Sequence, residues 1–554
     1  MSYGENQLVN AAISRAFALI DYNILYNDIH KQYEFIKQTI LADESLTESE
    51  KNEAIIMITK AYDGDKINSG QGTKRICENC NQECLATLHC EYCVRNYLKA
   101  NFSNWKSGND NIDNLIRECQ MKNSKPDRIA EMIPYNNLKN IKYLTKGGCS
   151  EIYTAKWING HFIEWNSKKQ QLKRFGSHNV VLKRLENIEN ANHSWLEEAK
   201  SHLIISNKWS DVVQCYGLTQ DPSNRDYMLV MNIMNIDLRK YLQQNHNQLT
   251  WKERIQIAVY IIDALERIHS ENSIHRDLHS GNILFKNKFI ISDLGFCGPA
   301  DKPLKSIYGN LPYIAPEVII GKEQTYKSDI YSIAMLMWEI SSGQLPFINY
   351  EHNYDLAMSI VNGIRPKIVP GTPLEYKNIM KQCWDANPSE RLDVETLQEK
   401  IRELNIFYQS KSNDQLEENN NNLGKNNNIN SLEKYISTSK VYQFENLPEP
   451  RNATEEELEV NHLIFNIDDF NKLNNQKNNS LSKINTSIFK VSSKKLSKIF
   501  KIKPKNDIQN DYKSEIVQPK VKKNDINFND EDEIYNNPNF HSEEQNELEL
   551  PDDI

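Results

Sequence analysis

The sequence predicts an α+β protein in which a small β-rich lobe is followed by a larger α-rich lobe. Short runs of β-branched and aromatic residues, typical of strands, crowd into the first half of the region 138–407. Four of these runs are expected as strands: 152–155, 180–182, 212–216 and 227–231. The second half has longer helical patterns, because apolar residues recur at helical spacing from Ile255 to His269 and the stretch from Ile333 to Ile340 is almost wholly apolar. We expect a cleft between the two lobes, where ligands commonly bind.

The composition indicates a chain that is only partly globular. Apolar residues make up 39% of the 554 residues, below the ~45–50% usual for globular domains in a count that includes Gly, so part of the length is not expected to join a core. The 66 Lys and Arg against 75 Asp and Glu leave a net charge of −9, which argues against a chain-wide nucleic-acid binder. Five of the ten cysteines lie between Cys77 and Cys93. This clustering is unlike a secreted disulfide framework and fits a reducing, intracellular compartment.

Neither end of the sequence shows a targeting signal. The N-terminal segment lacks a basic stretch before its apolar positions, and Arg15 and Asp21 interrupt those positions. No window approaches the about 18 uncharged apolar residues of a membrane helix. We therefore expect a soluble, cytoplasmic protein without a transmembrane segment.

Residues 1–75 are expected to be helical. Apolar positions recur there at roughly helical spacing, and Thr47-Glu-Ser-Glu50 resembles a capping box that opens a helix. We expect these helices to pack on the rest of the protein or on a partner protein, and they carry no catalytic motif.

Residues 408–554 are expected to be a disordered tail, through which partner proteins could also bind. Asn, Glu and Gln dominate 413–430, and such polar tracts cannot bury enough apolar surface to offset chain entropy. Seven lysines without acids lie between Lys490 and Lys505, whereas the last 25 residues hold ten acids and no Lys or Arg. Apolar residues interleave the lysine block, so it is either a solvated linker or an amphipathic helix for a membrane surface or a partner.

Two CxxC pairs predict a small zinc-binding module within 76–125. Cys77 and Cys80 form the first pair, Cys90 and Cys93 form the second, and nine residues separate the pairs. Two such pairs can complete a tetrahedral Zn²⁺ shell, which leaves no open position and so indicates a structural metal, about one zinc per chain. Cys84 and His89 are spare candidate ligands, and a redox pair or unliganded buried cysteines are the alternatives.

The strongest motif is Ile274-His-Arg-Asp-Leu-His-Ser-Gly-Asn-Ile-Leu284. Asp277 is followed five residues later by Asn282 and then, eleven residues further, by Asp293-Leu-Gly295. Phosphoryl transfer from Mg-ATP needs this order, in which one carboxylate accepts a hydroxyl proton and an amide and a second carboxylate hold the metal. We therefore expect Asp277, Asn282 and Asp293 to be catalytic, with ATP and Mg²⁺ as cofactors.

With these motifs the sequence resembles the eukaryotic protein kinases, specifically the tyrosine-kinase-like branch. The likeness covers roughly residues 140–405, and a CxxC module before such a domain is similar to an expanded set of fungal kinases. The resemblance implies a bilobal protein kinase fold, with the N-lobe at 138–234 and the C-lobe at 235–407. It also implies protein substrates, the transfer of phosphate to protein hydroxyls, and a catalytic Lys183 paired with Glu198, or with Glu197 as the fallback.

The resemblance further assigns a nucleotide site, with Met231 as the residue before a hinge at 232–234. The residues that it implies for nucleotide binding are Lys146, Gly147, Gly148, Ile152, Val181, Lys183, Glu198, Met231, Asn232, Met234 and Leu284. Architectural roles are implied for His275 and Leu294 in an internal apolar spine, for a Glu317–Arg391 pair, and for Asp329 as an anchor of the catalytic loop.

The sequence departs from the family pattern at several positions. Thr145 and Ser150 replace expected glycines of the nucleotide loop, Cys149 replaces its aromatic tip, and Val181 replaces a small Ala above the adenine. His279 replaces a phosphate-contacting Lys, and Asn310 replaces a Thr. A kinase-like scaffold without catalysis is therefore the alternative, although none of the four groups needed for the chemistry is lost. Ser/Thr specificity is favoured over Tyr, since most of the resembled branch phosphorylates Ser or Thr.

A phosphorylation switch is also predicted. Arg276 precedes the catalytic Asp, which is typical of kinases controlled by phosphorylation of the activation segment. Ser306 and Tyr308 are the hydroxyls before Gly309 and are the candidates for this modification.

Overall fold

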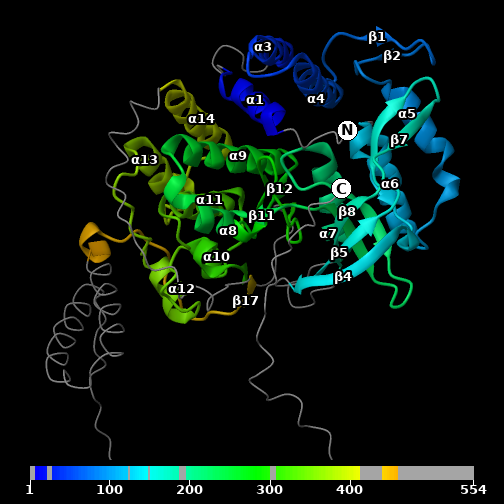
Figure 1. Cartoon of the computed structure of the whole chain (residues 1–554). Helices are drawn as coiled ribbons and strands as arrows, with labels where there is room; N and C mark the ends of the chain where they lie inside the picture. The colour runs from blue at the N-terminus through cyan, green and yellow to red at the C-terminus, as the bar shows by residue number, and fades with distance from the viewer. Residues whose placement is uncertain are drawn as a thin grey trace, which may run out of the picture. The chain divides into compact units, whose positions relative to one another are not determined.

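The structure is a computed structural model that describes residues 7–20, 28–122, 125–146, 150–185, 195–299, 307–411 and 439–459 (Figure 1). Gly147, Gly148, Cys149 and Ser306 lie outside these residues, as do the lysine block and the acidic end. None of the helices in these ranges has the length and apolar character needed to cross a membrane.

Three N-terminal helices pack together, as the helical periodicity predicts. They are α1 (Gln7–Ala18), α3 (Ile29–Ala42) and α4 (Glu48–Ser69). Val9, Ala12 and Ala16 of α1 are buried in the shared core, whereas Phe17 is exposed. The capping box of Thr47 and Glu50 opens α4, since each side chain satisfies a backbone N–H of the other residue.

The cysteine segment follows α4. It contains a short hairpin of β1 (Arg75–Ile76) and β2 (Glu83–Cys84), then α5 (Glu91–Ala100) and α6 (Asp110–Lys122). Asp63 of α4 accepts hydrogen bonds from the backbone N–H groups of Thr87 and Leu88 at 2.7 and 2.8 Å. Lys66, the buried partner of Asp63 on the same helix, also donates to Thr87 Oγ1 at 2.8 Å, and these contacts fix α4 to the cysteine segment.

A six-stranded sheet forms the N-lobe, in the order β3-β9-β10-β8-β5-β4. The strands are β3 (Glu131–Met132), β4 (Leu138–Lys146), β5 (Glu151–Trp157), β8 (His178–Arg184), β9 (Cys215–Gln220) and β10 (Tyr227–Asn232). Two details differ from the sequence expectation. The sheet gains β3 from before residue 138, and the expected strand at 212–216 begins only at Cys215, because Val212 bridges to Ile291 of the C-lobe instead.

A hairpin between β5 and β8 packs against the cysteine segment. Its strands are β6 (Phe162–Asn166) and β7 (Gln171–Arg174). Phe162, Trp165 and Leu172 of the hairpin join the cysteines in one apolar cluster, and the rings of Trp165 and Tyr97 meet edge to face. The insertion therefore supplies the apolar surface that so small a module lacks by itself.

The single N-lobe helix among the described residues is α7 (Trp195–Lys208), and it is packed from two sides. Ala199 and Leu203 of α7 share a buried cluster with Ile112 and Ile116 of α6 and with strands of the sheet. The N-terminal module thus buttresses the helix that carries Glu198.

The C-lobe is mostly helical, as predicted. Its helices are α8 (Leu238–Asn245), α9 (Trp251–Ser270), α10 (Pro316–Ile319), α11 (Tyr326–Ser342), α12 (Tyr354–Val361), α13 (Leu374–Cys383) and α14 (Val394–Ser410). Its short strands are β11 (Ile236–Asp237), β12 (Ser273–Ile274), β13 (Ile283–Phe285), β14 (Phe289–Ile291), β15 (Gly298–Pro299) and β16 (Ile307–Gly309). The almost wholly apolar α11 is buried along nearly its whole length, in contact with α9 and α13.

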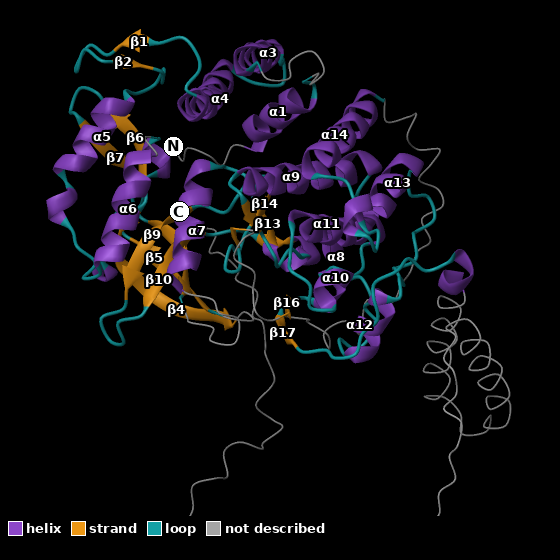
Figure 2. Ribbon diagram, turned by 180° about the vertical axis from the view of Figure 1, so that it is seen from behind, coloured by secondary structure: helices purple, strands orange, loops and turns teal. Residues whose placement is uncertain are grey.

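Part of the expected disordered tail is ordered, and this corrects the prediction for residues 439–459. The strand β17 (Lys440–Tyr442) pairs antiparallel with β16, and the two lie side by side in Figure 2. Tyr442 is buried in the C-lobe core, and Phe444, Leu447 and Leu458 pack against it. This segment has the apolar residues that the Asn-rich stretch before it lacks, so it can offset the entropy of ordering.

Candidate catalytic site

A buried ammonium joins the two lobes. Lys183 of β8 lies 2.8 Å from Glu198 Oε1 of α7 and also contacts the Asp293 carboxylate, which comes from the C-lobe. Glu197, the alternative partner, is exposed to solvent. Adjacent residues of a helix point about 100° apart, so only one of the two glutamates can reach Lys183.

The three charges perturb one another strongly. Burial by itself would lower the pKa of Lys183, but the two carboxylates raise it above its ordinary value. Burial would raise the pKa of Asp293, whereas the Lys183 ammonium holds it well below its usual range. Lys183 is therefore a cation and Asp293 an anion throughout the physiological pH range.

The catalytic loop, residues 274–284, is anchored by Asp329 of α11. Its carboxylate accepts hydrogen bonds from the backbone N–H groups of His275 and Arg276 at 2.8 and 3.0 Å, and it lies 2.9 Å from His269 Nε2. His275 and Leu294 are both fully buried. These contacts fix the backbone next to Asp277, which is the anchoring role that the family resemblance implied for Asp329.

Two residues of this region have left-handed backbone conformations, Arg276 with φ 70° and Asp293 with φ 53°. Such values are unfavourable for residues with a Cβ and are typical of functional sites whose surroundings enforce them. The hydrogen bond that Arg276 N donates to Asp329, and the ion pair of Lys183 with Asp293, provide that enforcement.

Asn282 is oriented by the catalytic loop itself. Its Nδ2 donates to the backbone oxygen of Asp277 at 2.9 Å, and its own backbone oxygen accepts from Ser292 N at 2.8 Å. The amide oxygen of Asn282 and the carboxylate of Asp293, which is 41% exposed, are hard oxygen donors of the kind that Mg²⁺ prefers.

The residues assigned to the nucleotide lie on the N-lobe sheet and beside it. Val181, Met231, Met234 and Leu284 share one apolar cluster, although Val181 and Met231 come from neighbouring strands and Leu284 from the C-lobe. Ile152 is the cross-strand partner of Lys183, and Lys146 is exposed at the end of β4. Asn232 ends β10 and is half-buried.

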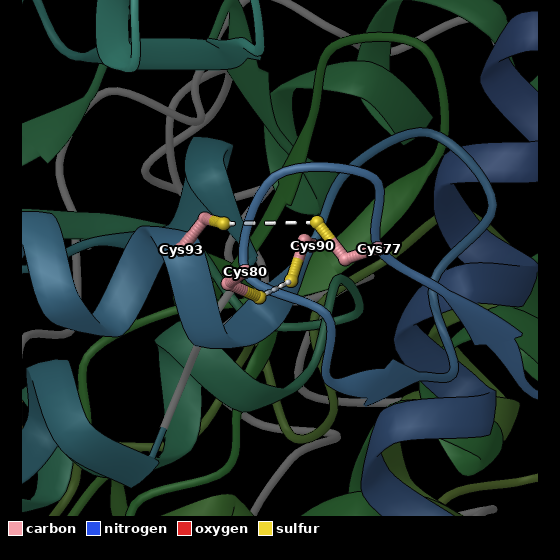
Figure 3. A group of neighbouring side chains, drawn as sticks. All are labelled: Cys77, Cys80, Cys90 and Cys93. Carbon is pink, nitrogen blue, oxygen red and sulfur yellow. Dashed lines mark hydrogen bonds between the residues drawn. The ribbon is translucent and has the colours of Figure 1, made fainter.

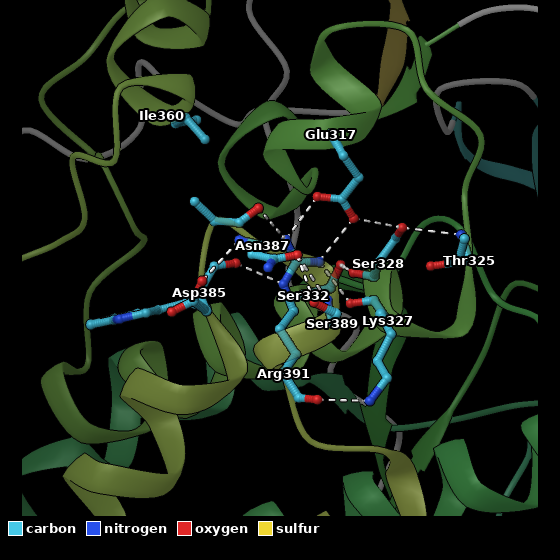
Figure 4. Close-up of polar contacts among 12 residues, drawn as sticks. Glu317, Thr325, Lys327, Ser328, Ser332, Ile360, Asp385, Asn387, Ser389 and Arg391 are labelled. Atoms are coloured by element: carbon cyan, nitrogen blue, oxygen red, sulfur yellow. Dashed lines mark hydrogen bonds and ion pairs between the residues drawn. The ribbon is translucent and has the colours of Figure 1, made fainter. Parts of the chain in front are cut away.

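The activation segment, which runs from Asp293 to Glu317, is held at its C-terminal end by the ion pair expected from the sequence. Arg391 meets Glu317 through two hydrogen bonds of 2.8 and 2.7 Å (Figure 4). Ser328 also donates to Glu317, and Lys327 donates to the backbone oxygen of Arg391 at 2.7 Å. Because the paired side chains are at most 6% exposed, this network fixes the end of the segment firmly.

Tyr308 lies in the centre of β16 and is buried at 3% exposure, with its ring stacked on Phe296 at 3.7 Å. A kinase cannot reach a hydroxyl in this setting without unfolding the strand. Burial therefore argues against Tyr308 as the predicted phosphorylation switch, and Ser306 lies outside the described residues.

Sequence reasoning missed two residues of this site. His202 of α7 is fully buried, and its Nε2 accepts a hydrogen bond from Leu294 N at 3.2 Å. Burial and the nearby Lys183 lower the pKa of His202 to about 3, so the ring is neutral. Ser439 from the tail contacts Asp277 and His279. Only the alternation of apolar residues at Tyr442 and Phe444 could have indicated a strand beside it.

The four cysteines of the two CxxC pairs converge at a second site (Figure 3). Their sulfur atoms all lie within 4.8 Å of one another, with 3.8 Å between Cys77 and Cys93 and 3.6 Å between Cys80 and Cys90. Burial would raise the pKa of Cys77, but backbone N–H groups of Cys80 and Asn79 lower it to about 7. Cys84 and His89 are also buried but lie outside this group of four.

Comparison with known proteins agrees with the fold. Residues 138–401 match the family described as protein tyrosine and serine/threonine kinase. The chain therefore carries a protein kinase domain, with a β-sheet N-lobe and a helical C-lobe.

Similar proteins include the probable serine/threonine-protein kinase roco5 of Dictyostelium discoideum, 28% identical over 300 residues, which are 50% of this chain and 10% of that protein. The dual serine/threonine and tyrosine protein kinase of Apis mellifera is 34% identical over 154 residues, 26% of this chain and 16% of that protein. The protein of the same description from Canis lupus familiaris is 34% identical over 170 residues, 30% of this chain and 18% of that protein. The chain thus spans less than a fifth of the length of these relatives.

Proposed function

We propose that this chain is an active ATP-dependent protein kinase that transfers the γ-phosphoryl group to protein hydroxyls. The observation that supports this best is the contact of Lys183 with both Glu198 and Asp293. This contact places Glu198 of α7 and Asp293 of the C-lobe, the proposed Mg²⁺ ligand, around one cation. Phosphoryl transfer in protein kinases requires this arrangement.

Each polar group then has a role. Asp277 orients the substrate hydroxyl and accepts its proton, and Lys183 positions the phosphates of ATP. Asn282 and Asp293 would hold Mg²⁺, which when bound offsets the charge on the transferred phosphoryl group. The left-handed backbone of Asp293 and the hydrogen bond from Asn282 to Asp277 place these oxygens before substrate binds, which reduces the reorganisation needed during the reaction.

Serine and threonine are the favoured acceptors. The names of the related proteins describe a serine/threonine kinase and dual-specificity kinases, which supports this preference. Membership of the tyrosine-kinase-like branch, with an N-terminal cysteine module like that of the fungal set, is part of the same proposal.

The decisive experiment is transfer from labelled ATP to a generic protein substrate with Mg²⁺, with wild type and Asp277→Asn compared. We expect transfer by wild type and a loss of at least about 1,000-fold in the variant, because the proton acceptor is removed while nucleotide binding remains. A scaffold without catalysis, which Val181 and His279 would favour, predicts no transfer by either protein.

We also propose that Cys77, Cys80, Cys90 and Cys93 hold one structural Zn²⁺. In a tetrahedron with Zn–S bonds of about 2.3 Å, the sulfurs lie about 3.8 Å apart. The two sulfur–sulfur distances of 3.8 and 3.6 Å fit that shell. A redox pair would need only two cysteines, whereas here four converge on one point.

A further inference from the structure

The hydroxyl of Ser439 occupies the place where a kinase positions its acceptor. Ser439 Oγ lies 2.8 Å from Asp277 Oδ1 and 3.0 Å from His279 Nε2, and the residue is only 5% exposed. Asp277 is the group to which we assign the acceptance of the acceptor's proton. A serine from the chain's own tail thus meets the catalytic base.

The hydrogen-bond directions around Ser439 follow from His279. Its Nδ1 accepts a hydrogen bond from Gly281 N at 3.1 Å, so in the neutral ring the proton is on Nε2. Nε2–H therefore donates to Ser439 Oγ, and the Ser439 hydroxyl donates to Asp277. The proton that must leave during transfer already points at the carboxylate that would take it.

Backbone pairing holds Ser439 in this place. The strand β17 adds to β16 of the activation segment, with Lys440 opposite Gly309, Val441 opposite Tyr308 and Tyr442 opposite Ile307. Strand addition of this kind is a common mode of peptide recognition, in which main-chain hydrogen bonds supply affinity and alternate side chains supply specificity. The alternation is present here, since Tyr442 is buried at 7% exposure whereas Val441 is 37% exposed.

The segment after β17 is fixed to the C-lobe at several further points. The rings of Tyr442 and Phe444 stack at 5.5 Å, and Phe444 meets Tyr354 of α12. Arg451 N donates to the backbone oxygen of Val361 at 3.1 Å, and Asn452 accepts from Ala386 N at 2.9 Å.

The backbone also passes very closely over Gly363. A Cβ added to Gly363 would lie 2.2 Å from Ala453 N, so the glycine leaves room for the tail to pass. The segment 439–459 therefore contacts the C-lobe at several separate points along its length.

We propose that Ser439 is a modification site that the kinase domain phosphorylates within its own chain. This inference rests on the proposed function. Ser439 Oγ attacks the γ-phosphorus of ATP and forms the new P–O bond, while the bond from that phosphorus to the bridging oxygen breaks. The bonding electrons leave with ADP, and the Ser439 proton passes to Asp277.

Phosphate on Ser439 would weaken the docking of the tail. A phosphoserine has a charge of about −1.5 to −2 at neutral pH. At position 439 it would face the Asp277 carboxylate, and the repulsion would release 439–442 from β16. Modification of Ser439 thus frees the acceptor site for other protein substrates.

The test uses the purified full chain with Mg-ATP and maps phosphate by mass spectrometry over time. We expect phosphate on Ser439, resolved from the neighbouring Ser437 and Thr438 by fragment ions. Its rate constant should be unchanged when the chain concentration varies about tenfold, because the reaction is intramolecular. In the Asp277→Asn protein Ser439 should stay unmodified, also after this protein is mixed with wild type.

Two matched variants on β17 separate docking from catalysis. Tyr442→Ala removes a buried anchor and should slow modification of Ser439 about tenfold or more, since the acceptor is then held for a smaller fraction of the time. Val441→Ala changes the exposed neighbour on the same strand and should alter the rate by less than about twofold. Both variants should still phosphorylate myelin basic protein added as an external substrate.

Four results would overturn the inference. Transfer to myelin basic protein with Ser439 unmodified would leave the kinase assignment intact and refute the role of Ser439. A rate constant proportional to chain concentration would refute the intramolecular step. So would phosphate on Ser439 of the Asp277→Asn protein after it is mixed with wild type. Absence of transfer to any acceptor would refute the proposed function and this inference together.

Discussion

Lys183 Nζ and Glu198 Oε1 lie 2.8 Å apart, and both side chains are almost completely removed from solvent. The same ammonium contacts Asp293. An isolated buried charge is costly, so the buried Lys183 and Glu198 depend on each other, and the more exposed Asp293 gives the ammonium a second carboxylate. Because Glu198 is on α7, which also packs against α6 of the N-terminal module, the position of Lys183 is linked to structure well outside the kinase domain.

Glu198→Gln should therefore lower phosphoryl transfer by about 10- to 100-fold, since Lys183 loses one of its two carboxylates and its aim at the phosphates. Steady-state kinetics with ATP and a protein substrate measures this. The matched control is Glu197→Gln, which changes the exposed neighbour on the same helix and should leave the rate within about twofold. Equal losses in the two variants would contradict the pairing.

His202 should make stability depend on pH. Its folded-state pKa of about 3 lies below the unfolded value, so the unfolded chain binds the extra proton first as the pH falls. The stabilisation is complete above about pH 6.5 and is lost toward pH 3 by up to about 1.4 kcal/mol per pH unit.

Urea unfolding at about pH 7 and about pH 5.5 tests this against His202→Gln. The glutamine amide oxygen can still accept from Leu294 N but does not titrate. We expect the wild type to lose about 1 kcal/mol more than the variant over this interval. The same loss in both proteins would show that His202 is not the responsible group.

Removal of one zinc ligand should release the metal. Cys77→Ser takes a thiolate from the four-sulfur group, so the zinc content should fall from about one per chain to a small fraction of that, with a lower melting temperature. Metal analysis of purified protein measures the content. Cys84→Ser is the control, because Cys84 is buried in the same module but lies outside the group. Absence of zinc from the wild type would refute the assignment.

Arg391→Met should destabilise the kinase domain by about 3–5 kcal/mol, because it leaves the Glu317 carboxylate buried without its cation. Chemical unfolding measures the difference. As a comparison, Lys322 and Glu449 form an ion pair whose side chains are 54% and 76% exposed. Lys322→Met should cost less than about 1 kcal/mol, since water already screens that pair. A small cost for Arg391→Met would mean that the network in Figure 4 adds little to stability.

The reaction class could be predicted from local spacing. Asp277, Asn282 and Asp293 fall within one short stretch, and the order of a carboxylate, an amide and a second carboxylate predicts phosphoryl transfer without reference to any long-range contact. The buried α11 and the capping box at Thr47 were predictable for the same reason, because periodicity and capping act between residues a few positions apart.

Features that depend on distant contacts were not predictable in this way. The segment 439–459 follows an Asn-rich stretch and was expected to be disordered, yet β17 finds its partner strand in the activation segment. The edge strand β3 likewise joins the N-lobe sheet through pairing with β9, far along the chain. Strand pairing depends on which edge is free in the folded protein, and a short segment does not encode that by itself.

By itself, the sequence determined that this chain has a protein kinase domain, that Asp277, Asn282 and Asp293 follow one another in one short stretch of it, and that two CxxC pairs lie before it. Tertiary structure decided that Glu198 rather than Glu197 meets Lys183, because packing of α7 against α6 sets the rotation of the helix. It also decided that Ser439, 162 residues from Asp277, donates a hydrogen bond to the Asp277 carboxylate. The physical reason is common to both: side-chain chemistry is a property of each residue, whereas the choice of partner is made by burial and backbone pairing across the whole fold.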